Sequence, residues 1–357
     1  MKSTAPSNLN FWHRKRVLVT GHTGFKGSWL CLWLQSIGAT LRGIALDPPT
    51  TPALFDVARV AEGMEHRIVD IRNFTAVKAQ MDEFQPEIII HMGAQPLVRY
   101  SYQEPIETYA TNVMGTVHVL EAARHAGSVK AVINVTTDKC YENHEWVWGY
   151  RENEPMGGHD PYSSSKGCSE LVTSAYRRSF YESAGIALAS ARAGNVIGGG
   201  DWAEDRLMPD ILRALEKKKP VVIRYPAATR PWQHVLEPLC GYLQLAEKLY
   251  QNDNAYSGAW NFGPNDEDTK PVEWIVEQMI TKWGQDASWQ KDANSQPYEA
   301  NFLKLDISKA KSQIGWSPKW SLEHALESIV YWHQCWLLKE DMQKVCLEQI
   351  SNYTNSD

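Results

Sequence analysis

Residues 17–27 read Val17-Leu18-Val19-Thr20-Gly21-His22-Thr23-Gly24-Phe25-Lys26-Gly27. A β-branched run here meets a turn with GxxGxxG spacing, and an apolar helix is expected over residues 28–37, ending at Gly38. Such glycines permit a tight turn and let the backbone approach a pyrophosphate, which then lies on the positive end of the helix dipole. A purely structural glycine turn is the alternative. The residues expected to bind a dinucleotide here are Gly21, Thr23, Gly24, Phe25, Lys26 and Gly27.

Short apolar runs alternate with segments of helical period along the first half of the chain, which is the pattern of a parallel sheet covered on both faces. A helix is expected between Asn112 and Gly127, where apolar residues recur at spacings of three and four. We therefore predict an α/β fold with a doubly wound parallel sheet of the Rossmann type. Further strands are expected at residues 41–46, 67–70, 88–92, 131–136 and 186–191.

The sequence pattern changes after Arg192. A triple glycine follows, and then come short elements that are interrupted by Pro and Gly. This change predicts a smaller C-terminal lobe. We expect a dinucleotide-binding domain over residues 12–192, with a returning segment at about 228–263. The substrate-binding lobe would then comprise residues 193–227 and 264–345.

Composition argues against several classes of partner. The 357 residues include 42 acidic and 36 dispersed basic ones, so we expect no nucleic-acid partner. No window reaches the roughly 18 apolar residues of a membrane span, and the opening segment lacks the apolar part of a signal peptide. The six cysteines are scattered without metal-ligand spacing. We expect a cytoplasmic protein with reduced thiols, no membrane partner and no metal site.

Two acidic residues follow expected strands. Asp47 closes the second strand, where a carboxylate can accept hydrogen bonds from an adenosine ribose, and no Lys or Arg follows to hold a 2′-phosphate. This favours NAD over NADP, although Asp47 could instead cap the following turn. Asp70 and Ile71 end the third strand near the expected adenine edge; capping of the next helix is the alternative for Asp70.

Tyr162 and Lys166 lie four residues apart, so they share one face if the segment is helical. A lysine ammonium one turn from a phenol stabilises the phenolate and would let Tyr162 take a proton near neutral pH. YxxxK alone is a weak pattern. It becomes informative beside the dinucleotide turn and a strand that ends in Thr136-Thr137-Asp138.

These motifs, in this order, resemble those of the extended short-chain dehydrogenases/reductases that act on nucleotide-sugars. The resemblance covers about residues 12 to 330. It rests on the glycine turn, Asp70-Ile71-Arg72, Asn112-Val113-Met114-Gly115-Thr116, Thr136-Thr137-Asp138, the YxxxK pair and Arg192-Ala193-Gly194-Asn195-Val196.

The resemblance implies a bound NAD, a nucleotide-sugar substrate and a homodimer, possibly a tetramer. It places Asn195 against the nucleotide-sugar and Arg230, in an Arg-x-Trp-x-x-Val segment, against the pyrophosphate. Further cofactor contacts are expected from Gly93, Ala94, Gln95, Thr111, Tyr162 and Lys166. For residues 91–95, plain packing at the end of a strand is the alternative.

Within this family, 4,6-dehydratases carry Ser/Thr, Asp and an acidic residue where this chain has Thr137, Asp138 and Lys139. By resemblance, Tyr162 would remove the 4-hydroxyl proton of the sugar, Thr137 would polarise the 4-keto oxygen, and a protonated Asp138 would protonate the departing 6-hydroxyl. Lys139 would remove the C5 proton if it is neutral, or stabilise the enolate if it is charged. Asp138 could instead serve as a helix or turn cap.

The segments Gly-His-Thr-Gly-Phe-Lys-Gly-Ser-Trp-Leu and Thr-Thr-Asp-Lys-Cys-Tyr resemble the CDP-glucose 4,6-dehydratase branch in particular. That resemblance implies dehydration of CDP-glucose, in the supply of 3,6-dideoxy sugars for the O-antigen of a bacterial lipopolysaccharide. A nucleotide-sugar 4-epimerase, which needs only Tyr162, Lys166 and NAD, is the first alternative. A non-catalytic dinucleotide sensor is the second.

Overall fold

The computed structural model describes residues 9–284, 287–293 and 302–356. Its main element is a seven-stranded, all-parallel sheet with the strand order β11-β6-β5-β4-β1-β2-β3. The order reverses between β1 and β4, which is the switch point where open α/β sheets bind ligands. The strands are β1 Arg16–Thr20, β2 Thr40–Ala45, β3 Glu65–Ile68, β4 Ile88–His91, β5 Ala131–Val135, β6 Ala187–Ala193 and β11 Gly258–Phe262.

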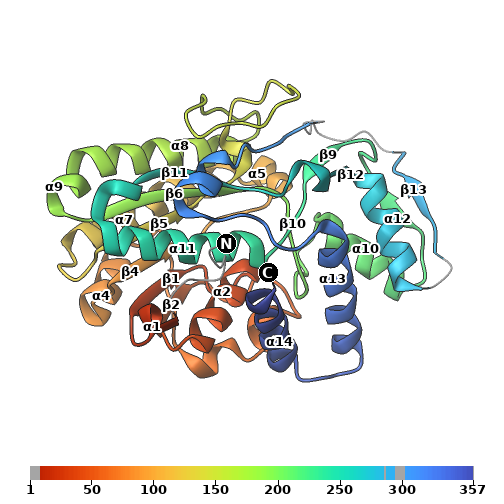
Figure 1. Ribbon diagram of the computed structural model, residues 1–357, viewed down its shortest axis with the longest axis horizontal. Helices are drawn as coiled ribbons and strands as arrows, with labels where there is room; N and C mark the ends of the chain where they lie inside the picture. The colour runs from red at the N-terminus through yellow and green to blue at the C-terminus, as the bar shows by residue number, and fades with distance from the viewer. Residues whose placement is uncertain (1–8, 285–286, 294–301, 357) are drawn as a thin grey trace.

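Helices cover both faces of this sheet (Figure 1). Val17 and Val19 of β1 enter the core beneath α2 and α11, whereas Leu18 enters the core beneath α4 and α7. This alternation is what a strand buried on both faces requires. The helices of this part are α1 Leu9–Trp12, α2 Phe25–Ser36, α3 Leu54–Val57, α4 Phe74–Phe84, α5 Val98–Gln103, α6 Pro105–Tyr109, α7 Gly115–His125, α8 Pro161–Tyr176, α9 Glu182–Ala184 and α11 Leu236–Asn252.

A smaller lobe with its own apolar core lies to the right in Figure 1. It is built from α10 Leu207–Glu216, α12 Val272–Trp283, α13 Leu322–Leu337, and the paired strands β8 Val221–Ile223 and β13 Trp289–Lys291. Two further strand pairs lie between the lobe and the sheet: β7 Val196–Ile197 with β10 Gln233–His234, and β9 Thr229–Pro231 with β12 Thr269–Pro271. The last helix, α14 Met342–Asn355, returns to α2, where Tyr353 packs on Trp33.

The predicted doubly wound parallel sheet is confirmed. Helix α2 begins at Phe25, three residues earlier than expected, because it starts directly from the glycine turn. The strand expected at 67–70 lies at Glu65–Ile68. The boundaries expected for the two domains stay a prediction, although β11 does join the sheet from within the returning segment. None of the helices in the described part of the chain has the length and apolarity to cross a membrane.

Candidate active site

The glycine turn lies at the switch point and is closely packed. Gly21 has φ of 74°, and a Cβ on it would lie 2.8 Å from the backbone nitrogen of Gly93, which follows β4. A Cβ on Gly27 would lie 2.2 Å from the carbonyl oxygen of Gly21. Both positions therefore require glycine: the first for its conformation and close approach, the second so that α2 can pack on the turn.

The opposite holds at Gly24, the residue before α2. The atom nearest to a Cβ on Gly24 would be the Gly21 carbonyl oxygen, at 3.4 Å. Gly24 is the N-cap residue of α2 and has no side chain that could bond the first amides of the helix. Thr23 donates a hydrogen bond of 2.9 Å to the Leu46 carbonyl and so fixes the turn beside exposed Asp47. A helix N-terminus with free space above it and a carboxylate at the next strand end fits the pyrophosphate and ribose of NAD.

Asp70 and Ile71 border the same region. Asp70 forms a multiply bonded ion pair with Arg72, whose guanidinium holds the pKa of that carboxyl below its usual value. The cap of α4 is Asn73, so the capping alternative for Asp70 is wrong. Ile71 is buried, and its Cδ1 would lie 3.3 Å from a Cβ placed on Gly93.

A buried polar network holds the segment after β4. The Thr20 hydroxyl accepts hydrogen bonds from the amides of Met92 and Gly93, and Gln95 exchanges two hydrogen bonds with the side chain of Asn112. Asn112 also donates to the Ser165 hydroxyl on α8.

Asn112 thus ties residues 93–95 to the helix that carries Tyr162 and Lys166. Its neighbour Thr111, an expected cofactor contact, lies in the same π-helical segment, Ala110–Met114. The sequence showed Asn112 only as part of a motif and did not reveal this role.

Tyr162 and Lys166 lie in the first two turns of α8, which Asp160 caps by accepting from the Ser163 amide. Burial raises the pKa of Tyr162 to about 12, while a hydrogen bond with Thr137 opposes this and the charge of Asp138 adds to it. Lys166 donates to the Val135 carbonyl at 3.1 Å, and burial lowers its pKa to about 8. The pKa of Tyr162 is therefore raised and not lowered as expected.

Thr137 and Asp138 follow β5 and lie beside Tyr162. The Thr137 hydroxyl donates to Asp138 Oδ1 at 3.0 Å and is also the cap of the short 3-10 helix Asp138–Cys140. Asp138 is 1% exposed, and within the described residues its Oδ2 has no hydrogen-bond partner. Thr137, and not Asp138, therefore caps this helix, so the capping alternative for Asp138 is wrong. Lys139 is half-buried next to it.

Two further basic side chains, Lys26 and Arg206, lie near Lys166 and Tyr162. Lys26 was expected only to bind the cofactor, but its ammonium donates to the Tyr242 hydroxyl at 3.2 Å. Burial, together with repulsion by Lys166 and Arg206, lowers the pKa of Lys26 to about 7, while Asp138 opposes the shift. Arg206 lies just before α10, bonds Asp201 at 2.9 Å, and is also an electrostatic neighbour of Tyr162.

No sequence pattern predicts a role for Arg206, because nothing in its neighbourhood marks it. A lone arginine before a lobe helix gives no signal until the fold places it beside the YxxxK helix.

The two expected substrate contacts lie on the lobe side of the sheet. Asn195 has φ of 38°, and its buried Oδ1 has no hydrogen-bond partner within the described chain. Such an atom costs about 1–3 kcal/mol unless a ligand satisfies it. Arg230 lies in β9 and is 3% exposed, and one guanidinium nitrogen donates to the Thr229 carbonyl at 3.0 Å.

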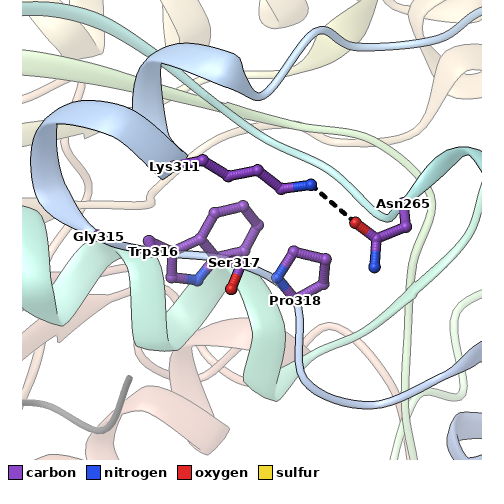
Figure 2. Close-up of a pocket in the computed structure, with 6 residues that line it drawn as sticks. All are labelled: Asn265, Lys311, Gly315, Trp316, Ser317 and Pro318. Carbon is purple, nitrogen blue, oxygen red and sulfur yellow. Dashed lines mark hydrogen bonds between the residues drawn. The ribbon is translucent and has the colours of Figure 1, made fainter. Parts of the chain in front are cut away.

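A separate surface cavity of about 410 Å³ lies under the turn before α13 (Figure 2). Its lining consists of Asn265, Lys311, Gly315, Trp316, Ser317 and Pro318, with Lys311 bonded to the Asn265 side chain at 2.9 Å. These residues do not include any of those expected at the active site. Among the residues that the structure describes, no cluster of His, Cys, Asp and Glu could hold a metal ion.

Comparison with known proteins identifies the family of the chain. Residues 18–329 match the family described as GDP-mannose 4,6 dehydratase. The chain is 59% identical to a CDP-glucose 4,6-dehydratase of Salmonella typhimurium, covering 97% of this chain and 98% of the relative. A probable dTDP-glucose 4,6-dehydratase of Sinorhizobium fredii is 24% identical, covering 89% and 92%.

Solved structures share the fold. A UDP-glucose 4-epimerase of Thermotoga maritima with UDP-glucose superposes with a TM-score of 0.77 at 22% identity, covering 90% of this chain and 99% of that one. A dTDP-glucose 4,6-dehydratase of Bacillus anthracis in complex with NAD superposes with a TM-score of 0.73 at 23% identity, covering 90% and 96%. Because residues 18–329 match the family and one relative is 59% identical over nearly its whole length, this chain belongs to the GDP-mannose 4,6-dehydratase family.

Proposed function

We propose that this chain is an NAD-dependent CDP-glucose 4,6-dehydratase, which converts CDP-glucose into CDP-4-keto-6-deoxyglucose and water. The observation that carries the proposal is the buried group of Thr137, Asp138 and Tyr162, in which a carboxyl lies beside a phenol on a dinucleotide-binding fold. The name of the Salmonella relative supports CDP-glucose as the substrate. A 4-epimerase needs only Tyr162, Lys166 and NAD, so the Asp138 carboxyl favours dehydration over epimerisation.

The residues that would hold NAD are those of the switch point. The amides at the start of α2 and the space above Gly24 would take the pyrophosphate, Asp47 the adenosine ribose, and Asp70 and Ile71 the adenine side. Gly93, Ala94, Gln95 and Thr111 would line the nicotinamide side. When bound, NAD accepts a hydride from C4 of the sugar and returns one to C6.

Tyr162 acts first in the proposed mechanism, by taking the proton of the 4-hydroxyl. With a pKa of about 12, the phenol needs help from positive charge to do so near neutral pH. Arg206 is a cationic neighbour of the phenol, and Lys26 is in turn a neighbour of Arg206 and Lys166. Thr137 bonds the phenol and is placed to polarise the 4-keto oxygen that forms.

Elimination follows, because the 4-keto group makes the C5 proton acidic. Asp138 then gives a proton to the C6 oxygen, which departs as water, while the C5–H electron pair forms the C5–C6 double bond. Lys139 removes the C5 proton if its amine is neutral; if its amine is charged, it stabilises the enolate and another group takes the C5 proton. When hydride is then added at C6, a proton returns to C5, so the net change is the loss of one water.

The substrate's CDP part would lie toward the smaller lobe. The unpartnered Asn195 Oδ1 suits a hydroxyl of the nucleotide-sugar, and the Arg230 guanidinium suits the pyrophosphate oxygens. Both assignments come from the family resemblance and are consistent with the position of the two residues beside β6 and β9.

We also propose a homodimer formed through α5, α6, α7 and α8. Large apolar side chains are exposed on this side, with Ile106 84%, Leu171 62% and Met114 47% exposed. Exposed apolar side chains on these helices suit a helical bundle between two copies. Replacing Ile106 with Glu should convert the dimer to monomer in analytical ultracentrifugation; a monomeric unmodified protein would refute the proposal.

The mechanism is tested by separating oxidation from elimination. Tyr162→Phe should abolish the transient nicotinamide absorbance that reports C4 oxidation. Asp138→Asn should keep this absorbance and exchange of the C5 proton with deuterated water, but lose water about 10²–10⁴-fold more slowly. An Asp138→Asn variant that dehydrates at the normal rate would contradict the assignment of the acid.

A further inference from the structure

Gly194 directly follows β6 and precedes Asn195, and the mechanism gives it no part. A Cβ placed on Gly194 would lie 1.8 Å from Oδ2 of Asp138, 2.4 Å from its Cγ and 3.1 Å from its Oδ1. All three nearest atoms therefore belong to one carboxyl group. The Asp138 carboxyl, with Oδ2 nearest, occupies the space that any side chain at residue 194 would fill.

The backbone conformation does not explain the glycine. Asn195 adopts a left-handed φ of 38°, but Gly194 itself does not have a positive φ. An alanine could therefore adopt the same backbone angles without strain. What excludes a side chain at residue 194 is the position of Asp138.

The Gly194 backbone is fixed from the other side. Gln233 of β10 donates its side-chain amide to the Gly194 carbonyl at 3.2 Å and its backbone amide to the Asn195 carbonyl at 3.3 Å. The next residue, Val196, begins β7, which pairs with β10. Residue 194 consequently cannot retreat from Asp138 without breaking this pairing.

The carboxyl is held from its own side as well. Thr137 donates to Asp138 Oδ1, and the same hydroxyl accepts from the Lys139 amide at 3.4 Å. Asp138 is thus enclosed between Thr137 and Gly194, 1% exposed, with Tyr162 as an electrostatic neighbour.

We propose that Gly194 is a positioning residue for dehydration: the missing side chain creates the slot that keeps the Asp138 carboxyl beside Thr137 and Tyr162. The inference rests on the proposed function, because Asp138 matters to the reaction only as its acid. Gly194 would act through Asp138, since the three atoms nearest to its Cβ position all belong to that side chain.

Gly194→Ala should turn the Asp138 carboxyl away from Thr137, because contacts below 3.0 Å are not tolerated and the backbone is clamped. We expect loss of water to slow at least about 100-fold, while C4 oxidation and KM stay within a few-fold of the unmodified enzyme. A matched control is Gly127→Ala, an exposed glycine whose Cβ would have no described atom within 4 Å.

The decisive experiment is a double-mutant cycle with Asp138→Ala, read by single-turnover mass spectrometry for water loss and by nicotinamide absorbance for oxidation. In the Asp138→Ala background, Gly194→Ala should change water loss less than about two-fold, because the clash is gone. A crystal structure of Gly194→Ala should show the Asp138 side chain rotated and the 194–196 backbone unmoved.

Two results would overturn the inference: full dehydration by Gly194→Ala, or an equal loss in both backgrounds, which would mark Gly194 as generally structural. Failure of the proposed function looks different. In that case Asp138→Ala itself would lose water at the normal rate, whatever residue 194 is.

Discussion

Replacing Glu237 with Gln should make the chain more stable at pH 8 but not at pH 5. Glu237 lies in the first turn of α11 and is 1% exposed, and burial raises the pKa of its carboxyl to about 7. The carboxyl accepts hydrogen bonds from the Trp320 amide at 2.7 Å, the Lys319 amide at 3.1 Å and the Tyr353 hydroxyl at 2.7 Å. These hydrogen bonds therefore join Lys319, Trp320 and Tyr353, in the C-terminal part of the chain, to α11, which packs on the sheet.

The size of the effect follows from the two pKa values. The carboxyl titrates near 4.5 in the unfolded chain and near 7 in the folded one, so between these pH values the folded chain binds more protons. The free energy of unfolding therefore falls as pH rises through this window, by about 3 kcal/mol in total at ~1.36 kcal/mol per pH unit. For a chain of 357 residues, about 2 cal/mol/K per residue converts this to about 4 °C in Tm.

Glutamine keeps one acceptor and can donate to Tyr353, but it does not ionise. Thermal melts of both proteins from pH 5 to pH 8 should therefore diverge, with the Glu237→Gln variant about 4 °C above the unmodified chain at pH 8. Only the difference is diagnostic, because buried His22, His91 and His234 have lowered pKa values and make stability rise with pH at the acidic end. Glu323→Gln, at an exposed position of α13, is the control. A difference in Tm between the two proteins that does not change with pH, or one of opposite sign, would contradict the raised pKa of Glu237.

Two further substitutions have effects that the structure sets directly. Gly27→Ala puts a Cβ 2.2 Å from the Gly21 carbonyl oxygen, so NAD binding measured by calorimetry should fall at least about 100-fold; binding within two-fold of normal would mean that the turn is not the cofactor site. Arg192→Met leaves Glu170 buried without its 2.8 Å ion pair, so urea unfolding should show a loss of about 3–5 kcal/mol, and a loss below about 1 kcal/mol would show that Glu170 is neutral in the folded chain.

The sheet was predictable because its signals are local. β1 and the glycine turn are adjacent in the sequence, and the alternation of apolar runs with helical segments predicted a parallel sheet. The bounds of the edge strand β3 were harder to predict. β3 lies two residues earlier than expected. Three of its four residues are charged or polar, so the apolar pattern does not mark the strand, and only pairing with β2 fixes its register.

The candidate site was predictable only in part. Motif spacing identified Tyr162 and Asp138, but it could not show that Lys166 bonds the Val135 carbonyl, because that contact joins a helix to a strand 31 positions away. Lys26 and Arg206 meet near Tyr162 only after the lobe folds onto the sheet. Clusters of like charge formed by long-range contacts leave no pattern in a single sequence.

Mass spectrometry of the products identifies the nucleotide-glucose that the enzyme dehydrates. The purified protein would be incubated with NAD and, separately, with CDP-, UDP-, TDP- and GDP-glucose, with Tyr162→Phe as the inactive control. We predict loss of one water from CDP-glucose, with little or no loss from the other three and none from the control. Preferential dehydration of another nucleotide-glucose would contradict the substrate, and no loss of water from any of the four would contradict the proposed reaction.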